Sequence, residues 1–293
     1  MIDIGLNLSH AQFAPDLDAV MERARAAGVE GFLLTGTSQK HSEEALALAN
    51  RFPDRARSTA GVHPHDARHW TPSVARRIRE LAQDPMVSCV GECGIDYDRN
   101  FSTHDEQTRA FAAQMDLSLE LGKPAFLHWR PGSDAQPAID AFEAIARPFA
   151  AAGGRGVVHC FTGTRAMLES SLEMGFSIGV TGWVCDERRG AELQALIPFI
   201  PADRLLIETD APYLIPRTMP GAKKLRRNEP AFLIHVAQEV ARLRGVSVEE
   251  IARVSTENAR ALFSWPAADL SAERAAHSAE NVSSRAPSSG GAR

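Results

Sequence analysis

Apolar runs rich in β-branched residues alternate with helix-like stretches from the first residues to about residue 209. The strand-like runs lie near residues 2–8, 31–36, 57–62, 87–95, 124–128, 156–160, 176–182 and 205–209. Such alternation predicts parallel strands joined by crossover helices. Eight strand–helix units match a closed (β/α)8 TIM barrel of the α/β class better than an open doubly wound sheet. No Gly-x-Gly-x-x-Gly segment opens the first unit, which lowers the dinucleotide-binding alternative.

The length of the chain suits one barrel with a short extension. At 293 residues it is slightly longer than a typical barrel of ~250 residues. After the eighth strand the pattern predicts a long loop, an amphipathic helix near 230–244, a short helix near 247–254 and one more turn near 258–263. We therefore predict a single barrel domain over residues 1–265. Residues 266–293 are rich in Ala, Ser and Gly without apolar periodicity, which predicts a disordered tail.

Composition and charge argue against several classes of protein. No apolar run approaches the ~20 residues that cross a bilayer, and the first residues lack the pattern of a signal peptide. The four cysteines show no Cys-x-x-Cys spacing, as expected of reduced thiols in a cytoplasmic protein. A net charge of −5 argues against a protein that coats nucleic acid generically. We expect a cytoplasmic protein without a membrane partner, and a monomer by default because no feature indicates a dimer face.

Side chains able to bind a metal follow four of the predicted strands. Glu92, His128, His159 and Asp210 each come at the end of an apolar run. Because the carboxyl ends of barrel strands meet at one mouth, we expect these side chains to converge on one divalent ion there. Each has an ordinary alternative: an arginine salt bridge for Glu92, hydrogen bonding for either histidine, and turn capping for Asp210. Their joint occurrence favours a metal site.

Two further side chains near these strand ends are candidates for supporting roles. Glu208 shares the face of Asp210 by strand alternation, and we expect it to lie below Asp210 as a buried partner. His63 follows the third strand, before a proline that fixes an extended turn. We expect His63 to reach a substrate phosphate or a water at the metal. His65, two residues later, is equally well explained as a loop residue.

Basic and aromatic residues near the same end of the barrel suggest contacts with a substrate. The loop over residues 217–227 carries five basic residues and no acidic one. Such a loop can hold phosphates, which makes Arg226 and Arg227 candidate substrate-binding residues, although a solvated loop is the common alternative. Trp129 and Trp183 follow barrel strands and could stack on an unpaired base, although packing is the more common role of a tryptophan.

Segments spread over the chain together resemble the TatD family of metal-dependent nucleases, within the amidohydrolase-like barrels. The resemblance runs from residue 3 to about residue 263, and its most specific segments are 61–65, 91–96, 159–163, 182–190 and 208–213. The resemblance implies that the protein hydrolyses phosphodiester bonds. Its substrate would be single-stranded DNA or RNA, from whose 3′ end nucleotides are released. It also implies Mg²⁺ as the working ion, whereas imidazole ligands by themselves suit Mn²⁺ or Zn²⁺ better.

The first strand departs from the pattern of many family members. They begin with Asp-x-His-x-His, whose two histidines hold one of two metals, whereas residues 3–7 here read Asp-Ile-Gly-Leu-Asn. Gly5 has no side chain to offer, and Asn7 offers only a neutral oxygen. The site with Glu92 and the two strand-end histidines remains. We therefore expect a single firmly held ion, or one firm and one transient ion.

The resemblance also implies roles for the remaining candidates. An ion at Glu92 and the two histidines would polarise the phosphate and activate a water. Asp210 would then orient or deprotonate the attacking water. His63 and Arg130, together with the basic loop, would hold phosphate oxygens.

Two other functions stay open at the level of sequence. The same ligands could serve a metal-dependent ester or amide hydrolase, such as an aminoacyl-tRNA deacylase or a cyclic amidase, because fold and ligands do not fix the substrate. A non-catalytic barrel scaffold is the other, and its only support is the loss of histidines at Gly5 and Asn7. Retention of the four strand-end ligands argues against the scaffold.

Overall fold

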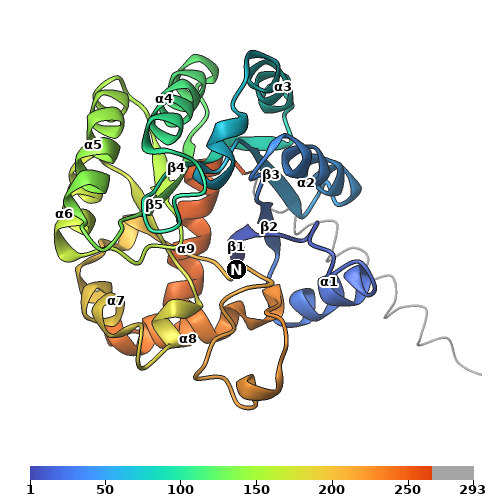
Figure 1. Cartoon of the computed structure of the whole chain (residues 1–293). Coiled ribbons are helices and arrows are strands. Elements are labelled where there is room, and N and C mark those ends of the chain that lie inside the picture. The colour runs from blue at the N-terminus through green and yellow to red at the C-terminus, as the bar shows by residue number, and fades with distance from the viewer. Residues whose placement is uncertain (266–293) are drawn as a thin grey trace, which may run out of the picture.

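The computed structural model describes residues 1–265, and its strands form one eight-stranded parallel sheet (Figure 1). Each strand pairs with its successor in the chain, from β1 to β8. The strands are β1 Ile2–Leu6, β2 Gly31–Leu34, β3 Ala56–Ala60, β4 Val87–Asp96, β5 Ala125–Arg130, β6 Gly156–Val158, β7 Ser177–Val180 and β8 Leu205–Ile207. The predicted barrel fold is confirmed. The predicted disordered tail, 266–293, lies outside the described residues.

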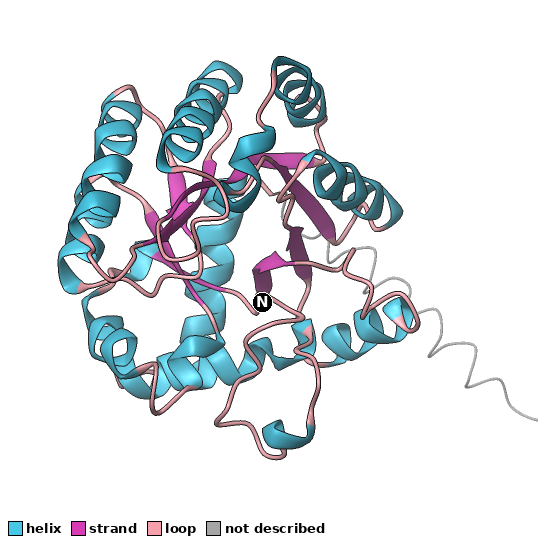
Figure 2. Ribbon diagram, in the orientation of Figure 1, coloured by secondary structure: helices cyan, strands magenta, loops and turns pink. Residues whose placement is uncertain are grey.

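Helices surround the strands, which occupy the centre of the molecule (Figure 2). The α-helices are α1 Leu17–Ala26, α2 Gln39–Arg51, α3 Pro72–Ala82, α4 His104–Leu121, α5 Gln136–Ala151, α6 Arg165–Glu173, α7 Ala191–Leu196, α8 Leu233–Arg244 and α9 Val248–Phe263. Short 3₁₀ helices lie at η1 Pro64–His69, η2 Gly182–Cys185, η3 Ile197–Phe199, η4 Ala202–Arg204, η5 Ala222–Lys224 and η6 Pro230–Phe232. Of these, η1 and η2 directly follow barrel strands and carry side chains to the mouth.

The seam between the last and first strands is closed by a few specific contacts. A parallel bridge joins Leu6 to Ala211, beyond the end of β8. Asp3 in β1 is fully buried, and its carboxylate accepts the backbone N–H of Thr209 at 2.9 Å and the Thr209 hydroxyl at 2.5 Å. These bonds reduce the cost of burying Asp3, although burial still raises its pKa to about 8. They also fix the segment after β8 against β1.

The interior of the barrel is filled at the end opposite the mouth. Apolar side chains from β1, β2, β4, β5, β6 and β8 pack together with α9, which lies behind the strands in Figure 1. The packed residues are Ile2, Ile4, Leu33, Cys89, Phe126, Val157, Leu206, Ala259, Phe263 and Trp265. Because this layer closes one end, the carboxyl ends of the strands form the mouth where chemistry can take place.

One helix runs further than the sequence pattern predicted, and another continues through a proline. The short helix near 247–254 and the turn near 258–263 form one continuous helix, α9. Helix α5 continues to Ala151 although Pro148 lies inside it. Phe142 and Phe149 are both buried on its inner face, so packing outweighs the hydrogen bond that the proline removes.

The described part of the chain bears on two expectations from composition. None of its helices combines the length and apolar character needed to cross a membrane. The four cysteines are all free thiols, and Cys89, Cys93 and Cys185 are buried. Cys160 is partly exposed because it follows β6 at the mouth.

Candidate metal centre

One carboxylate oxygen of Glu92 is the meeting point of three histidines at the mouth. Glu92 Oε1 lies 2.9 Å from Nδ1 of His128, 3.0 Å from Nε2 of His159 and 3.2 Å from Nε2 of His63. All four side chains are nearly buried. They come from β4, β5 and the segments after β6 and β3, so adjacent strands bring them together. The structure thus brings three of the four predicted ligands into direct contact.

Outer carboxylates orient the two predicted histidine ligands. Nε2 of His128 lies 3.2 Å from Asp96 Oδ2, and Nδ1 of His159 lies 3.0 Å from Glu208 Oε2. A histidine that donates one ring N–H to a carboxylate presents its other nitrogen to a metal. The other nitrogens here, Nδ1 of His128 and Nε2 of His159, both face Glu92 Oε1. One carboxylate and two oriented imidazoles form a donor set that fits a divalent ion.

The protonation of these groups follows from the same contacts. Burial acts to lower the pKa of His159, but the carboxylates of Glu92 and Glu208 raise it well above its ordinary value. Burial acts to raise the pKa of Glu92, yet the neighbouring His159 and His63 hold it well below its usual range. The chain therefore keeps an anionic oxygen here and balances it with a proton on His159. A metal ion would displace that proton on binding.

His63 is close enough to be a ligand, but its hydrogen bonds favour a donor role. The ligand atoms of His63, Glu92 and His128 lie within 4.8 Å of one another. However, Nδ1 of His63 accepts the backbone N–H of His65 at 3.1 Å, which leaves the ring proton of a neutral imidazole on Nε2. Burial lowers the pKa of His63 to about 4, so the ring is neutral at pH 7. We infer that Nε2 of His63 donates a hydrogen bond.

Asp96 is a central residue of the site that the sequence analysis missed. Its Oδ2 lies 2.7 Å from Nε2 of His65 and 3.2 Å from both Nε2 of His128 and Nη1 of Arg130. Burial opposes ionisation, but hydrogen bonds from His128 and His65 hold the pKa of Asp96 well below its usual range. Strand alternation could have revealed it, because residues four apart in β4 share the face of Glu92. Asp96 thus links the metal centre to Arg130.

Asp210 lies at the mouth but apart from the oxygen that the histidines share. The side-chain amide of Asn7 donates to Asp210 Oδ1 at 3.4 Å, and no ion pair joins Asp210 to His128 or His159 in the described structure. Burial raises its pKa to about 7. A carboxyl that titrates near neutrality is suited to accept a proton. Asn7, in the place of a family histidine, therefore supports Asp210.

Glu208 lies in a cradle made by two glycines. Gly5 in β1 and Gly179 in β7 flank β8, and a Cβ atom added to either would overlap the Glu208 carboxylate. Glu208 is fully buried, and besides His159 it accepts the backbone N–H of Cys160 at 2.5 Å. Glu208 is buried as predicted, but in the described structure its side-chain hydrogen bonds are with His159 and Cys160 and not with Asp210. The absence of side chains at the two glycines leaves the space that its carboxylate fills. A side chain at position 5, where the family pattern given above has a histidine, would therefore displace the Glu208 carboxylate.

The fold and this arrangement can be compared with known proteins. A sequence profile described as TatD-related DNase matches residues 2–264. The chain belongs to this family. It is 52% identical over 263 residues to the protein named 3′–5′ ssDNA/RNA exonuclease TatD from Erwinia amylovora, covering 90% of this chain and 99% of the relative. The protein of the same name from Rahnella is also 52% identical, over 267 residues, covering 91% and 99%.

Solved structures of TatD relatives share the barrel. A TatD family hydrolase from Entamoeba histolytica superposes with a TM-score of 0.79 at 25% identity, covering 91% of this chain and 98% of that one. YJJV, a TatD homologue from Escherichia coli, gives the same TM-score, identity and coverage. This chain therefore shares the TatD fold over nearly the whole length of both solved structures.

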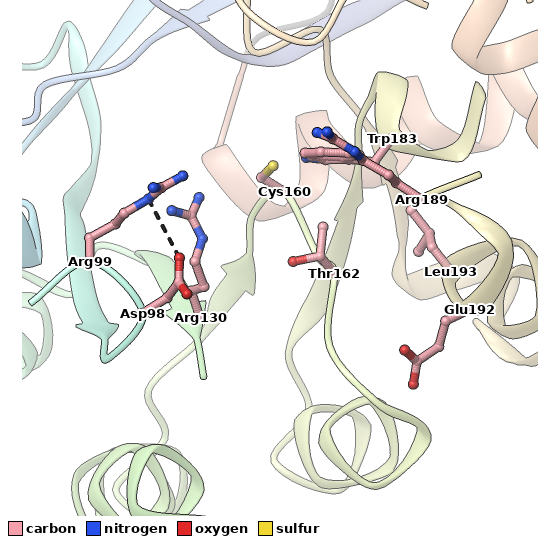
Figure 3. A pocket seen from close by; sticks show the side chains of 9 residues that line it. All are labelled: Asp98, Arg99, Arg130, Cys160, Thr162, Trp183, Arg189, Glu192 and Leu193. Atoms are coloured by element: carbon pink, nitrogen blue, oxygen red, sulfur yellow. Dashed lines mark ion pairs between the residues drawn. The ribbon is translucent and has the colours of Figure 1, made fainter. Parts of the chain in front are cut away.

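A cavity of about 300 Å³ adjoins the centre, and Figure 3 shows its lining. Arg99 and Arg130 lie on one side, while Arg189 and Trp183 lie side by side on the other. Cys160, next to His159, lies between them. The carboxylates of Asp98 and Glu192 also line the cavity, and Asp98 forms an ion pair with Arg99. Three guanidinium groups around one cavity are suited to a polyanionic substrate.

The two predicted stacking residues have different environments. Trp129 is buried and stacks on Phe142, with ring centroids 4.0 Å apart, and its indole N–H donates to the Ala138 carbonyl. The idea that Trp129 offers a face to a base is therefore wrong, because its face is covered by the core. Trp183 is only partly buried and lines the cavity, as a stacking residue would.

The two predicted phosphate-binding arginines of the 217–227 loop are not part of the cavity. Arg227 Nη2 lies 2.6 Å from Asp16 Oδ2 and 2.8 Å from Glu229 Oε1. Arg23 also contacts Glu229, with Nε 2.7 Å from Oε2. We call these four residues the Glu229 cluster. Arg227 is committed to it, while Arg226 is exposed, so a substrate role for either finds no support in the geometry.

The Glu229 cluster should contribute measurably to stability. Glu229→Gln should lower the free energy of unfolding at pH 7 by about 2 kcal/mol, because it weakens charge-assisted bonds to two arginines. That loss corresponds to a fall in Tm of roughly 4 °C. Calorimetry at pH 7 measures it. Glu22→Gln, which breaks only the exposed pair with Arg25, is the matched control and should change Tm by less than about 1 °C.

The difference in Tm between wild type and Glu229→Gln should depend on pH. Burial acts to raise the pKa of Glu229, but hydrogen bonds from Arg23 and Arg227 lower this pKa in the folded state. Its contribution is therefore present above the unfolded pKa of about 4.5 and is lost as the pH falls below that value. The difference in Tm between wild type and Glu229→Gln should be full at pH 7 and shrink as the pH falls below about 4.5. A difference that grows on acidification would contradict this assignment.

Proposed function

We propose that this chain is a metal-dependent nuclease that removes nucleotides from the 3′ end of single-stranded DNA or RNA. The observation that carries the proposal is the convergence of His128 and His159 on one oxygen of Glu92, each backed by its own carboxylate. The names of the bacterial relatives supply the substrate and the polarity. The arginines of the adjoining cavity support an anionic substrate over a neutral ester or amide.

A divalent ion at Glu92, His128 and His159 would neutralise charge on the phosphate and make an attacking water more acidic. We propose Mg²⁺ as this ion, following the family, with Mn²⁺ and Zn²⁺ as the alternatives that imidazole ligands favour. Calorimetric titration with each ion and metal analysis of the purified protein distinguish the three.

The side chains around this site have distinct tasks in the reaction. Arg130, held by Asp96, donates hydrogen bonds to a non-bridging phosphate oxygen as negative charge accumulates. His63 presents its Nε2–H to the same region and stays neutral. Asp210, with a pKa of about 7, accepts the proton of the attacking water. We further propose that the protein acts in the cytoplasm and as a monomer.

The polarity of degradation tests the proposal directly. Single strands labelled at either end are incubated with the protein and Mg²⁺, Mn²⁺ or EDTA. A 5′ label should appear in products that shorten by one nucleotide at a time, a 3′ label should appear at once in mononucleotide, and EDTA should abolish both. Internal fragments formed at early times, or full activity in EDTA, would contradict a metal-dependent 3′ exonuclease.

A further inference from the structure

A second cavity of about 560 Å³ lies next to the first and shares a wall with it. Trp183 and Arg189 line both cavities. The second cavity is also lined by Asp186, Leu214, Arg217 and Lys223. Neither the metal centre nor the mechanism above uses this space. Its volume lies within the range of ordinary small-ligand pockets.

The shared wall is an aromatic ring with a cation beside it. Trp183 lies in η2, directly after β7, and the guanidinium carbon of Arg189 is 5.9 Å from its ring centroid. Figure 3 shows Arg189 alongside Trp183, across the first cavity from Arg99 and Arg130. A nucleic-acid strand that leaves the first cavity over this wall meets a stacking surface and a positive charge together. Those are the two elements that single-stranded nucleic acid requires.

Charge in the second cavity favours a phosphate. Arg189, Arg217 and Lys223 contribute positive charge, and Asp186 is the acidic residue of the lining. Arg217 Nε lies 2.9 Å from Asp186 Oδ2, and the backbone N–H groups of Arg188 and Arg189 donate to Asp186 Oδ1. Because the carboxylate is already paired and hydrogen-bonded, Arg189 and Lys223 give the cavity an excess of positive charge.

The other part of the lining is apolar. Pro212, Leu214, Ile215 and Leu225 come from the segment that follows β8 and complete the wall beside Trp183. Leu225 is 39% exposed, so part of this apolar surface faces the open cavity. An apolar half and a cationic half in one cavity match a nucleobase and its phosphate better than inorganic phosphate alone.

We propose that the second cavity is a subsite for an upstream nucleotide of a single strand, whose terminal nucleotide lies at the metal centre. This inference rests on the proposed function for the direction of the strand, but not for the existence of the subsite. It predicts that affinity depends on strand length in a step. A dinucleotide fills the first cavity only, and a longer strand adds contacts with Lys223 and the Trp183 wall.

Binding without turnover tests the subsite. Unlabelled oligodeoxynucleotides of two, three, four and six nucleotides, with nuclease-resistant phosphorothioate linkages, are titrated into wild type with Mg²⁺ by calorimetry. Affinity should rise about tenfold once the strand reaches the second cavity, and then level off. Lys223→Glu should remove most of that rise and leave dinucleotide binding within about twofold of wild type, because Lys223 lines only the second cavity.

The matched control is Arg188→Glu, which makes the same charge change in an exposed neighbour of Arg189 that lines neither cavity. It should keep the step. Equal loss in both variants would mean that only long-range charge acts, and absence of a step in wild type would overturn the subsite. Cleavage with Mg²⁺ separates the two proposals: a binding step without cleavage refutes the nuclease alone, and cleavage without a step refutes the subsite alone.

Discussion

The Glu92→Gln variant should lose phosphodiester hydrolysis by at least about 10³-fold and bind divalent ions too weakly to measure. Glutamine keeps the shape of the side chain but removes the negative charge that His63, His128 and His159 share. The charge that holds an ion, and through it the phosphate, is then missing, and loss of a bound ion costs several kcal/mol of transition-state stabilisation. Single-turnover rates on a labelled strand and calorimetric metal titration measure the two effects.

A surface glutamate provides the control for this variant. Glu249→Gln removes the same charge from the exposed first turn of α9, away from the mouth, and should keep wild-type turnover and metal affinity. Circular dichroism should show that both variants are folded. Wild-type hydrolysis by Glu92→Gln would refute the metal centre, and lost hydrolysis with wild-type metal affinity would move the ion to another site.

Gly5→Ala should lower turnover by about 10- to 100-fold and the free energy of unfolding by about 1–3 kcal/mol. The added Cβ would overlap Glu208 Oε2, the oxygen that lies 3.0 Å from Nδ1 of His159. A displaced Glu208 no longer orients His159, and loss of such an outer partner typically costs 10–100-fold in metal affinity or activity. The overlap itself strains a packed interior. Turnover, metal affinity and thermal unfolding are measured together.

A double-mutant cycle shows whether the carboxylate is the cause. In a Glu208→Ala background a Cβ at position 5 meets only the Phe126 ring, at 3.3 Å, so Gly5→Ala should cost less than half of what it costs in wild type. Glu208→Ala itself should lower metal affinity, because His159 loses its outer partner. Additive effects of the two substitutions would show that Gly5 acts independently of Glu208.

These two predictions bear on what the altered first strand means. The absence of a histidine at Gly5 could have indicated a barrel that had lost half of its site. Instead, the space beside Gly5 holds the carboxylate that fixes His159. Asn7, the other departure, donates to Asp210. Both positions therefore contribute to a centre built around Glu92.

Some of the site was beyond sequence reasoning because it depends on partners far apart in the chain. Arg227 was predicted to bind phosphate from the charge of its loop, but it pairs with Asp16, 211 residues away. His65 was explained equally well as a loop residue, yet it lies in η1 and contacts Asp96 at the end of the neighbouring strand β4. Local charge shows that a cation is present, and only the fold shows whether another group of the protein already neutralises it.

The sequence by itself determined the barrel and the strands that carry Glu92, His128 and His159, because strand–helix alternation and strand polarity are local properties that fix a common mouth. Tertiary structure alone decided which atoms meet there. The cradle of Gly5 and Gly179 around Glu208, and the shared wall of Trp183 and Arg189, arise where distant segments approach within a few ångströms. Such approach depends on side-chain volume and close packing around the whole barrel, which no local pattern records.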